Sequence, residues 1–305
     1  MAPYSIVVVT WQSAPVLQAL VATMNSHLKS RPELIVVDNR SSDEPERTVG
    51  EYLGQTRFIP LEENRGYGAA CNVGVEAAGS STVVMLNPDI ELLDSSLNEL
   101  VAFAARRHAL AGPLLLNPDR SVQPSAWAGS VGPSPWIGAL LPGPVQPRPL
   151  RERLEPWRAK RTIAVGWLAG ACLAAPREAL LRLGPFDPAI HLYSEDLDLG
   201  LRAKRAGIPS YFCPDLCRVV HRGGASASIA FPRGAYGLAA RNRRAVLRRA
   251  YGSRRERAAW LALRLNLRLR VMAKRVLGRD ATPQRALLEA VRSTRTVREL
   301  PPAPG

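Results

Sequence analysis

The sequence predicts an α/β fold built around central parallel strands. Three runs are continuously apolar, rich in β-branched residues and closed by polar residues: residues 5–10, 34–38 and 82–86. Runs of this kind are typical of parallel strands that are covered on both faces. We expect segments 14–28 and 68–78, which lie between these runs, to be the crossover helices.

The polar residues that end the three runs are expected at one edge of the sheet. They are Thr10-Trp11, Asp38-Asn39 and the turn from Asn87 to Asp89. In open α/β sheets, ligands bind beyond the carboxyl ends of the strands. This edge is therefore the first place to expect a functional site.

Length and composition favour a folded protein with one large core, or a main domain with a smaller appendage. The chain has 305 residues, 46% of them hydrophobic, which excludes a disordered chain. No apolar stretch reaches the length of a membrane span, and the chain enters its first strand without an apolar leader, so we expect no export signal and a cytoplasmic protein. The four cysteines fit neither a paired metal motif nor a disulfide scaffold.

The net charge of +15 is concentrated at the end of the chain. Residues 241–305 contain 18 Lys and Arg against four Asp and Glu, and the rest of the chain is close to neutral. We therefore divide the chain into a main domain, residues 1–240, and a basic extension, residues 241–305. The extension is predicted to be mainly helical, although residues 263–271 alternate between apolar and polar in a way that a helical period does not explain.

The middle of the chain differs in character from the strands before it. Residues 112–161 are rich in Pro and Gly and contain Trp127, Trp136 and Trp157. Long loops in compact domains are often binding loops, so we expect this loop-rich segment to contact an acceptor substrate; a surface excursion without function is the alternative. A strand at 163–168, a helix from 176 and a helix over 197–206, stopped by Gly207, are predicted after it.

Carboxylates at strand ends and helix starts are the first candidates for chemistry. Asp38 and Asn39 suit hydrogen bonding to a flat polar ring such as a pyrimidine, but they are equally natural turn caps, and Asp43 lies nearby. Glu195 and Asp196 are adjacent acids at a predicted helix start. Each acid of such a pair raises the pKa of the other, and one of them is able to act as a catalytic base. The alternative is structural, because acidic residues at a helix start interact favourably with the helix dipole.

A divalent cation and a diphosphate have candidate ligands as well. Asp89 and Asn87 offer oxygen atoms to a hard cation, and His221 is the obvious additional ligand, although lone histidines are more often structural. Arg222 and the two glycines after it are able to approach a phosphate. Residues 64–74 match neither of the common phosphate-binding loops, but they are a plausible helix start beside a diphosphate.

Taken in order, these segments resemble the family-two GT-A glycosyltransferases, in particular the rhamnosyltransferase-like branch. The resemblance covers residues 5 to about 242 and rests on a series of short elements: VTWQ at 9–12, DNRSSD at 38–43, NRGYGAACNVG at 64–74, LNPD at 86–89, GWLAGA at 166–171, GPFD at 184–187, YSEDLDLGLR at 193–202, HRGGAS at 221–226 and RN at 241–242. The chain departs from the usual pattern at Gln12, Gly68 and Pro188. The occurrence of all these short elements in one order is far more specific than any single element.

The resemblance implies a GT-A fold, which is a Rossmann-like nucleotide-binding mixed sheet flanked by helices, and it assigns roles to residues. Asp196 is the implied catalytic base, with Glu195 beside it, and Asp89 and His221 are the implied ligands of Mg²⁺ or Mn²⁺. The implied nucleotide-sugar site comprises Thr10, Trp11, Asp38, Asn39, Asn64, Gly66, Asn87, Asp89 and Arg222. The implied acceptor side comprises Trp167, Gly170, Ala171 and Tyr193.

The implied reaction is an inverting, metal-dependent sugar transfer. The resemblance suggests dTDP-L-rhamnose as donor and a lipid-linked saccharide or cell-wall glycan as acceptor; a UDP-sugar-dependent hexosyl or galactofuranosyl transferase is the alternative. The basic extension suits an anionic membrane surface, which favours a peripheral position at the inner face of the cell membrane. A nucleic-acid-binding protein would leave the motifs unexplained, so no nucleic acid is expected as a partner, and the intact acidic residues argue against an inactive scaffold.

Overall fold

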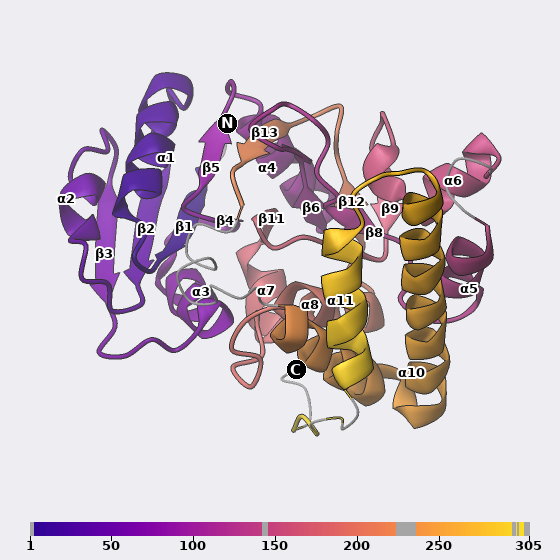
Figure 1. Ribbon diagram of the computed structural model, residues 1–305. Helices are drawn as coiled ribbons and strands as arrows, with labels where there is room; N and C mark the ends of the chain where they lie inside the picture. Colours follow the sequence, from indigo (N-terminus) through magenta and orange to yellow (C-terminus); the bar gives the residue numbers. More distant parts are fainter. Residues whose placement is uncertain (1–2, 142–145, 224–235, 295–296, 298, 302–305) are drawn as a thin grey trace.

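The computed structural model describes residues 3–141, 146–223, 236–294, 297 and 299–301. Within these ranges, the main sheet has eight strands in the order β3-β2-β1-β4-β11-β6-β12-β9. Helices lie against it, and two long C-terminal helices stand at one side of the molecule (Figure 1). The mixed α/β architecture with a helical C-terminal extension confirms the fold class that the sequence predicts.

The four parallel strands at one end of the sheet are β1 (Ser5–Thr10), β2 (Glu33–Asp38), β3 (Thr56–Pro60) and β4 (Thr82–Leu86). Alternate residues of β1 belong to different hydrophobic clusters: Ile6 and Val8 pack on one face of the sheet, and Val7 and Val9 pack on the other. Both faces are thus buried, which explains why these strands are continuously apolar. The crossover helices α1 (Ala14–His27) and α3 (Tyr67–Ala77) match the predicted segments closely.

The sheet becomes mixed at β11 (Cys172–Pro176), which runs antiparallel to β4 and brings the later part of the chain to the same edge. The helices α7 (Arg177–Leu183) and α8 (Glu195–Arg205) follow it. The other elements of this half are β5 (Ile90–Leu92), α4 (Leu97–Arg107), β6 (Leu110–Gly112), β7 (Leu114–Leu116), β12 (Ser210–Phe212) and β13 (Arg218–His221), with α2 (Pro45–Val49) near the start of the chain.

The segment from 112 to 161 contains more regular structure than its composition suggests. It includes β8 (Ala126–Trp127), α5 (Pro133–Leu140), α6 (Arg148–Leu154) and a short 3-10 helix at Pro156–Arg158. Proline stands in the first turn of both α-helices, where its missing N–H costs nothing. Proline therefore starts helices here rather than excluding them.

One continuous strand was predicted over residues 163–168, and this prediction was wrong, because the structure has two separate strands here. β9 (Ile163–Val165) joins the main sheet, whereas β10 (Trp167–Leu168) pairs with β8. The break falls at Gly166, where a side-chain carbon would lie 1.7 Å from the carbonyl oxygen of Ala128. Only glycine permits this close approach, and it directs Trp167 into a separate ribbon.

The basic extension forms α10 (Tyr236–Val276), with a break at Gly252, followed by α11 (Thr282–Ser293). The helix continues through residues 263–271 despite their alternating pattern, because Leu267 and Val271 pack against α11 while intervening residues face outward. Tertiary packing here overrides the local pattern. No helix in the described part of the chain has both the length and the apolar character needed to cross a bilayer.

Candidate active site

The turns after β1 and β2 are tied together at the carboxyl edge of the sheet. The backbone N–H of Asn39 donates to the Thr10 carbonyl at 2.9 Å, and the N–H of Gln12 donates to the Ser41 hydroxyl at 3.0 Å. The Asp38 carboxylate is buried and accepts the backbone N–H of Ser41 through both oxygens. Asp38 therefore caps the turn, as one of the two readings of the sequence expects, and remains at the predicted edge.

The remaining side chains around these turns also serve local structure. Thr10 Oγ1 and Ser13 Oγ form a buried hydrogen bond of 2.8 Å, and Ser13 Oγ also accepts the backbone N–H of the half-buried Trp11. Asp43 accepts the backbone N–H of Ala14 at 2.7 Å and so caps α1 from outside the helix. We assign Asp43 a structural role.

Asn39 positions the loop that enters α3. Its amide group donates to the Gly66 carbonyl at 3.1 Å and accepts the N–H of Arg65 at 3.0 Å, while Asn64 accepts the N–H of Gly66. Gly66 has φ of +84° and lies so close to the His191 carbonyl that a side-chain carbon would be 2.3 Å from it. Both ends of the Asn39 amide are thus occupied by backbone groups rather than left open toward a ligand.

Gly170 and Ala171 connect the end of β4 with the start of α8. The N–H of Asn87 donates to the Ala171 carbonyl at 2.8 Å, and the N–H of Gly170 donates to the Asp196 carboxylate at 3.3 Å. The Tyr67 hydroxyl donates to the Gly170 carbonyl at 3.0 Å. Residues from four separate predicted motifs therefore meet at one edge of the sheet.

Glu195 and Asp196 are adjacent acids in very different settings. Burial, and next the charge of Asp196, raise the pKa of Glu195 to about 8. One Glu195 oxygen has no hydrogen-bond partner among the described residues. Burial also raises the pKa of Asp196, but the N–H groups of Leu197 and Gly170 and the charge of Arg243 oppose that rise. At neutral pH the raised pKa favours a proton on Glu195, whereas the two N–H groups and Arg243 favour the charged form of Asp196.

The backbone before this acidic pair is held in an unusual conformation. Tyr193 and Ser194 both have positive φ, at 66° and 75°, which costs free energy for residues other than glycine. Asn242 stabilises this turn by donating to the carbonyls of Leu192, at 2.8 Å, and Tyr193, at 3.3 Å. The C-terminal extension thus helps to place Asp196.

Asp89 and His221 lie together and fit a divalent cation. The His221 Nε2 atom is 3.3 Å from Asp89 Oδ1 and 3.2 Å from the Asn87 amide nitrogen. Gln123 donates to Asn117, which leaves its carbonyl oxygen to accept the His221 Nδ1–H at 2.7 Å. Nδ1 therefore carries a proton, and Nε2 is the ring atom that faces Asp89, on the side where a cation would be held. No cluster of three or more His, Cys, Asp or Glu was found in the part of the chain described here.

Arg222 does not point freely into this site, because its guanidinium pairs with Glu91. Trp167 is buried against α8, and its ring stacks on Trp127 at 3.8 Å between centroids. Tyr193 is half-buried, and burial followed by the charge of Glu195 raises its pKa. Both residues therefore lie near the acidic pair. Trp167 packs against α8, and Tyr193 belongs to the turn that precedes this helix.

Three residues of this site were missed by sequence reasoning. Tyr67 donates to the Gly170 carbonyl, Gln123 accepts from the His221 ring, and Arg243 provides positive charge near Asp196. Tyr67 lies inside a recognised motif, so the motif was a usable signal. Gln123 and Arg243 are distant in sequence from the residues that they contact, and no periodicity or spacing points to them.

Comparison with known proteins identifies the family of the chain. Residues 5–155 match the family described as glycosyl transferase family 2. The chain is 32% identical over 235 residues to N-acetylglucosaminyl-diphospho-decaprenol L-rhamnosyltransferase of Mycobacterium tuberculosis, covering 71% of this chain and 75% of that protein. The chain belongs to glycosyl transferase family 2. Within the family it is similar to rhamnosyltransferases, as the sequence motifs predict.

Two further similarities extend this result. The O-antigen biosynthesis protein RfbC of Myxococcus xanthus is 28% identical over 201 residues, which cover 64% of this chain and 15% of that protein. The mannosyltransferase PcManGT of Pyrobaculum calidifontis, solved with GDP-Man and Mn²⁺, matches in structure with a TM-score of 0.62 and 16% identity, covering 96% of this chain and 86% of that one. At this identity the likeness shows the fold alone. This family 2 glycosyltransferase has the GT-A fold.

Proposed function

We propose that this glycosyltransferase moves L-rhamnose from dTDP-L-rhamnose to a lipid-linked saccharide whose sugar is attached through a diphosphate. The observation that carries the chemistry is the setting of Asp196, a half-buried carboxylate held by two backbone N–H groups beside the buried Glu195, whose pKa is raised to about 8. The donor and acceptor follow from the similarity to the mycobacterial rhamnosyltransferase. The same similarity supports a role in cell-wall or surface polysaccharide synthesis.

In this proposal Asp196 is the general base of an inverting reaction. Its carboxylate takes the proton of the acceptor hydroxyl while that oxygen attacks the anomeric carbon, and the bond to the nucleotide diphosphate breaks on the opposite face. A single displacement inverts the anomeric configuration. The protonated Glu195 adds no second negative charge, and Gly170 and Leu197 keep the carboxylate oriented.

The nucleotide-sugar site lies where the strand ends meet. Thr10, Trp11, Asp38 and Asn39 line the turns after β1 and β2, and Asn64 and Gly66 form the entry to α3. The N-terminus of α3 favours a negatively charged group. The Asp38 carboxylate caps the turn after β2 and so fixes this loop. The nucleotide base is proposed to bind against the loop.

Asp89 and His221 are proposed to hold Mg²⁺ or Mn²⁺, with Asn87 beside them. The two side chains offer one carboxylate oxygen and one unprotonated ring nitrogen, which suit such a cation. When bound, the cation neutralises charge on the departing diphosphate. Arg222, paired with Glu91, lies next to this cluster and contributes positive charge at its rim.

The experiment that tests the function compares dTDP- and UDP-sugars with the native chain and the Asp196→Asn variant. We expect metal-dependent binding of dTDP-rhamnose to both proteins, and transfer that is slower by about a hundredfold or more in the variant than in the native chain. Nuclear magnetic resonance of the product reports the anomeric configuration. Transfer from UDP-hexoses instead, or unaltered transfer by Asp196→Asn, would refute the donor and the base, respectively.

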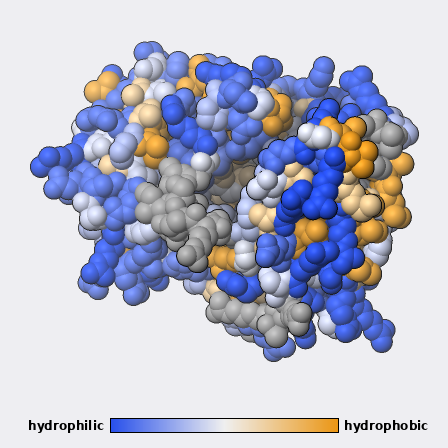
Figure 2. Space-filling model, viewed as in Figure 1, coloured by the Kyte–Doolittle hydropathy of each residue, from blue (hydrophilic) through white to orange (hydrophobic). Residues whose placement is uncertain are grey.

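We also propose that α10 rests on an anionic membrane surface at the cytoplasmic face. Residues 261, 265, 269, 272 and 276 recur at helical spacing and form one apolar stripe, of which Leu261, Met272 and Val276 are 56%, 61% and 86% exposed. Figure 2 shows hydrophobic side chains over the region where α10 and α5 lie. Arginines 257, 264, 268 and 275 occupy one edge of the stripe, as in helices that lie in a bilayer interface.

Vesicle flotation tests this surface. Met272→Asp should weaken binding to vesicles rich in phosphatidylserine, whereas Leu53→Asp, at an equally exposed leucine outside the extension, should not. Binding should fall as salt is raised. Equal binding to neutral vesicles, or preferential binding to DNA, would contradict the proposal.

A further inference from the structure

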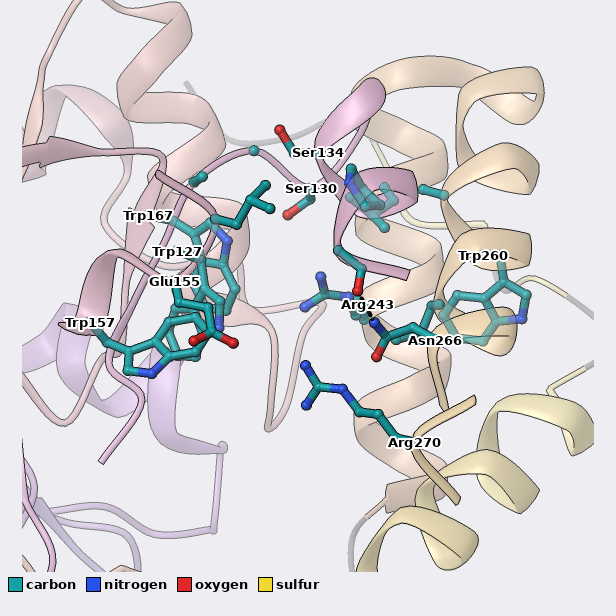
Figure 3. Close-up of a pocket in the computed structure, with 18 of the residues that line it drawn as sticks. Trp127, Ser130, Ser134, Glu155, Trp157, Trp167, Arg243, Trp260, Asn266 and Arg270 are labelled. Atoms are coloured by element: carbon teal, nitrogen blue, oxygen red, sulfur yellow. Dashed lines mark hydrogen bonds between the residues drawn. The ribbon is translucent and has the colours of Figure 1, made fainter. Parts of the chain in front are cut away.

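A pocket lies between the tryptophan ribbon and the C-terminal helix. Its volume is about 190 Å³, and it is bounded on one side by Trp127, Trp157 and Trp167 and on the other by Asn266 and Arg270 of α10. Trp127 stacks on Trp167, with ring planes 11° apart, and Trp157 lies 6.5 Å from Trp127. Figure 3 shows Arg243 and Arg270 projecting from α10 toward these indole rings.

Three buried polar atoms in the pocket wall have no hydrogen-bond partner among the described residues. They are Ser130 Oγ, Gln146 Oε1 and Trp167 Nε1, and their side chains belong to residues that are 5%, 8% and 6% exposed. Buried polar groups are rarely left unpaired, because each one costs about 1–3 kcal/mol. The Ser130 hydroxyl is able to donate and to accept, the Trp167 Nε1–H donates, and the Gln146 oxygen accepts. Three such atoms in one pocket match the hydroxyl and amide groups of a sugar.

The charges in the pocket favour an anion next to that sugar. Arg270 is exposed and has no acidic partner in the part of the chain described here, and Arg243 lies over the Trp167 ring, 5.9 Å from its centroid. The one carboxylate in the wall, Glu155, is already paired with Arg158 at 2.5 Å and Arg151 at 3.6 Å. Arg270 therefore offers its positive charge to a ligand, while Arg243 shares its charge with Asp196.

From these features we infer that this pocket binds the sugar-diphosphate head of the acceptor, an inference that rests on the proposed function. The indole rings contact the sugar ring, Ser130, Gln146 and Trp167 pair with its polar groups, and Arg243 and Arg270 pair with the diphosphate. The pocket shares Arg243 with the proposed base, because the charge of Arg243 acts on Asp196. Ligand occupancy and the charge of the base are thereby linked through one side chain.

The position of the pocket on α10 agrees with a lipid-linked ligand. Residues 259, 263, 266 and 270 line the pocket, while residues 261, 265, 269 and 272 form the apolar stripe on a different face of the same helix. One helix, α10, therefore carries both a wall of the pocket and the surface proposed to rest on the membrane.

Binding of a probe without donor tests the pocket directly. The probe is N-acetylglucosaminyl diphosphate carrying a short isoprenyl chain, added to the full chain and followed by tryptophan fluorescence and calorimetry. Arg270→Gln and Trp127→Leu should each raise its Kd by about tenfold or more. Trp127→Phe, which keeps an aromatic surface, should lose less, and Arg292→Gln, at an exposed arginine of α11 outside the pocket, should bind as the native chain does.

Ser130→Ala separates binding from folding. Since the Ser130 hydroxyl has no partner among the described residues, its removal should leave the unfolding temperature unchanged while it weakens probe binding. Isoprenyl diphosphate lacking the sugar should bind more weakly than the probe and should be insensitive to Ser130→Ala.

Two results distinguish the pocket from the function. If dTDP-rhamnose binds and sugar is transferred, but Arg270→Gln, Trp127→Leu and Ser130→Ala leave the Kd of the probe unchanged, the pocket assignment is wrong and the function stands. If the native chain binds no sugar nucleotide, the proposed function itself fails.

Discussion

The backbone N–H of Gly170 donates to the Asp196 carboxylate at 3.3 Å, and the carbonyl of the same glycine accepts the Tyr67 hydroxyl at 3.0 Å. One peptide segment thus joins the helix that follows β3 to the helix that carries the proposed base. Ala171, the next residue, accepts the N–H of Asn87 at the end of β4. The position of Asp196 relative to the sheet edge is therefore set by backbone groups, which do not change with side-chain rotamers.

Tyr67→Phe is expected to lower kcat about threefold to tenfold, since it removes one hydrogen bond that holds Gly170. The edge-to-face contact of the ring with Phe186 is retained, so stability should change little. Steady-state kinetics at varied acceptor concentration, together with nucleotide binding, measure the effect. A change in nucleotide affinity with unaltered kcat would mean that Tyr67 acts on the donor instead.

Glu195→Gln should make the free energy of unfolding less dependent on pH. The pKa of Glu195 is about 8 in the folded protein against 4.5 ordinarily, so between these values the folded chain keeps a proton that the unfolded chain has released. The native protein therefore loses stability as pH rises through this window. Urea unfolding at about pH 6 and about pH 9 should show the variant gaining relative to the native chain.

The exposed Glu62→Gln variant is the control for this measurement. It should follow the native pH dependence. If Glu195→Gln and Glu62→Gln behave alike, Glu195 does not carry the shifted pKa.

Arg249→Met should destabilise the protein by about 3–5 kcal/mol. Arg249 pairs with Asp187 at 2.5 Å and with Asp198 at 2.7 Å, and both carboxylates are buried. Removal of the arginine leaves buried negative charge without one of its partners. Arg248→Met, at the neighbouring residue, whose side chain is 41% exposed and lies 3.9 Å from the exposed Glu299, is the control and should cost less than about 1 kcal/mol. Equal unfolding free energies for the two variants, measured in urea, would contradict this role.

Gln123→Ala should reduce Mn²⁺ affinity by about tenfold to a hundredfold, measured by calorimetry in the presence of dTDP. The variant removes the group that accepts the His221 Nδ1–H at 2.7 Å and so releases the ring from its ligating orientation. Gln18→Ala, at a glutamine whose nearest partner is an exposed glutamate, is the matched control. Unchanged Mn²⁺ affinity in Gln123→Ala would argue against His221 as a ligand.

Much of the fold and the main landmarks of the site were predictable. The strands at 5–10, 34–38 and 82–86 and their crossover helices follow from continuous apolar runs, because a strand buried on both faces leaves that pattern. Asp89, His221 and Asp196 were identified through short motifs in a fixed order, and the structure brings Asp89 and His221 to within 3.3 Å of each other. The roles of these residues remain predictions until they are measured.

Other features depended on contacts between distant parts of the chain. The strand break at Gly166 follows from the approach of Ala128, and the helix over 263–271 follows from packing against α11. The local sequence records neither contact.

The sequence by itself determined the fold class, the family and the order of the motifs, because periodicity and local chemistry are written along the chain. Only the tertiary structure decided which of two adjacent acids holds the proton, that Asn39 serves the backbone, and that a pocket with unpaired polar atoms faces α10. These depend on burial, and on the field of residues such as Arg243, which lies 47 positions beyond Asp196 in the chain. Burial and electrostatic interaction are set by distance in space, which the fold creates.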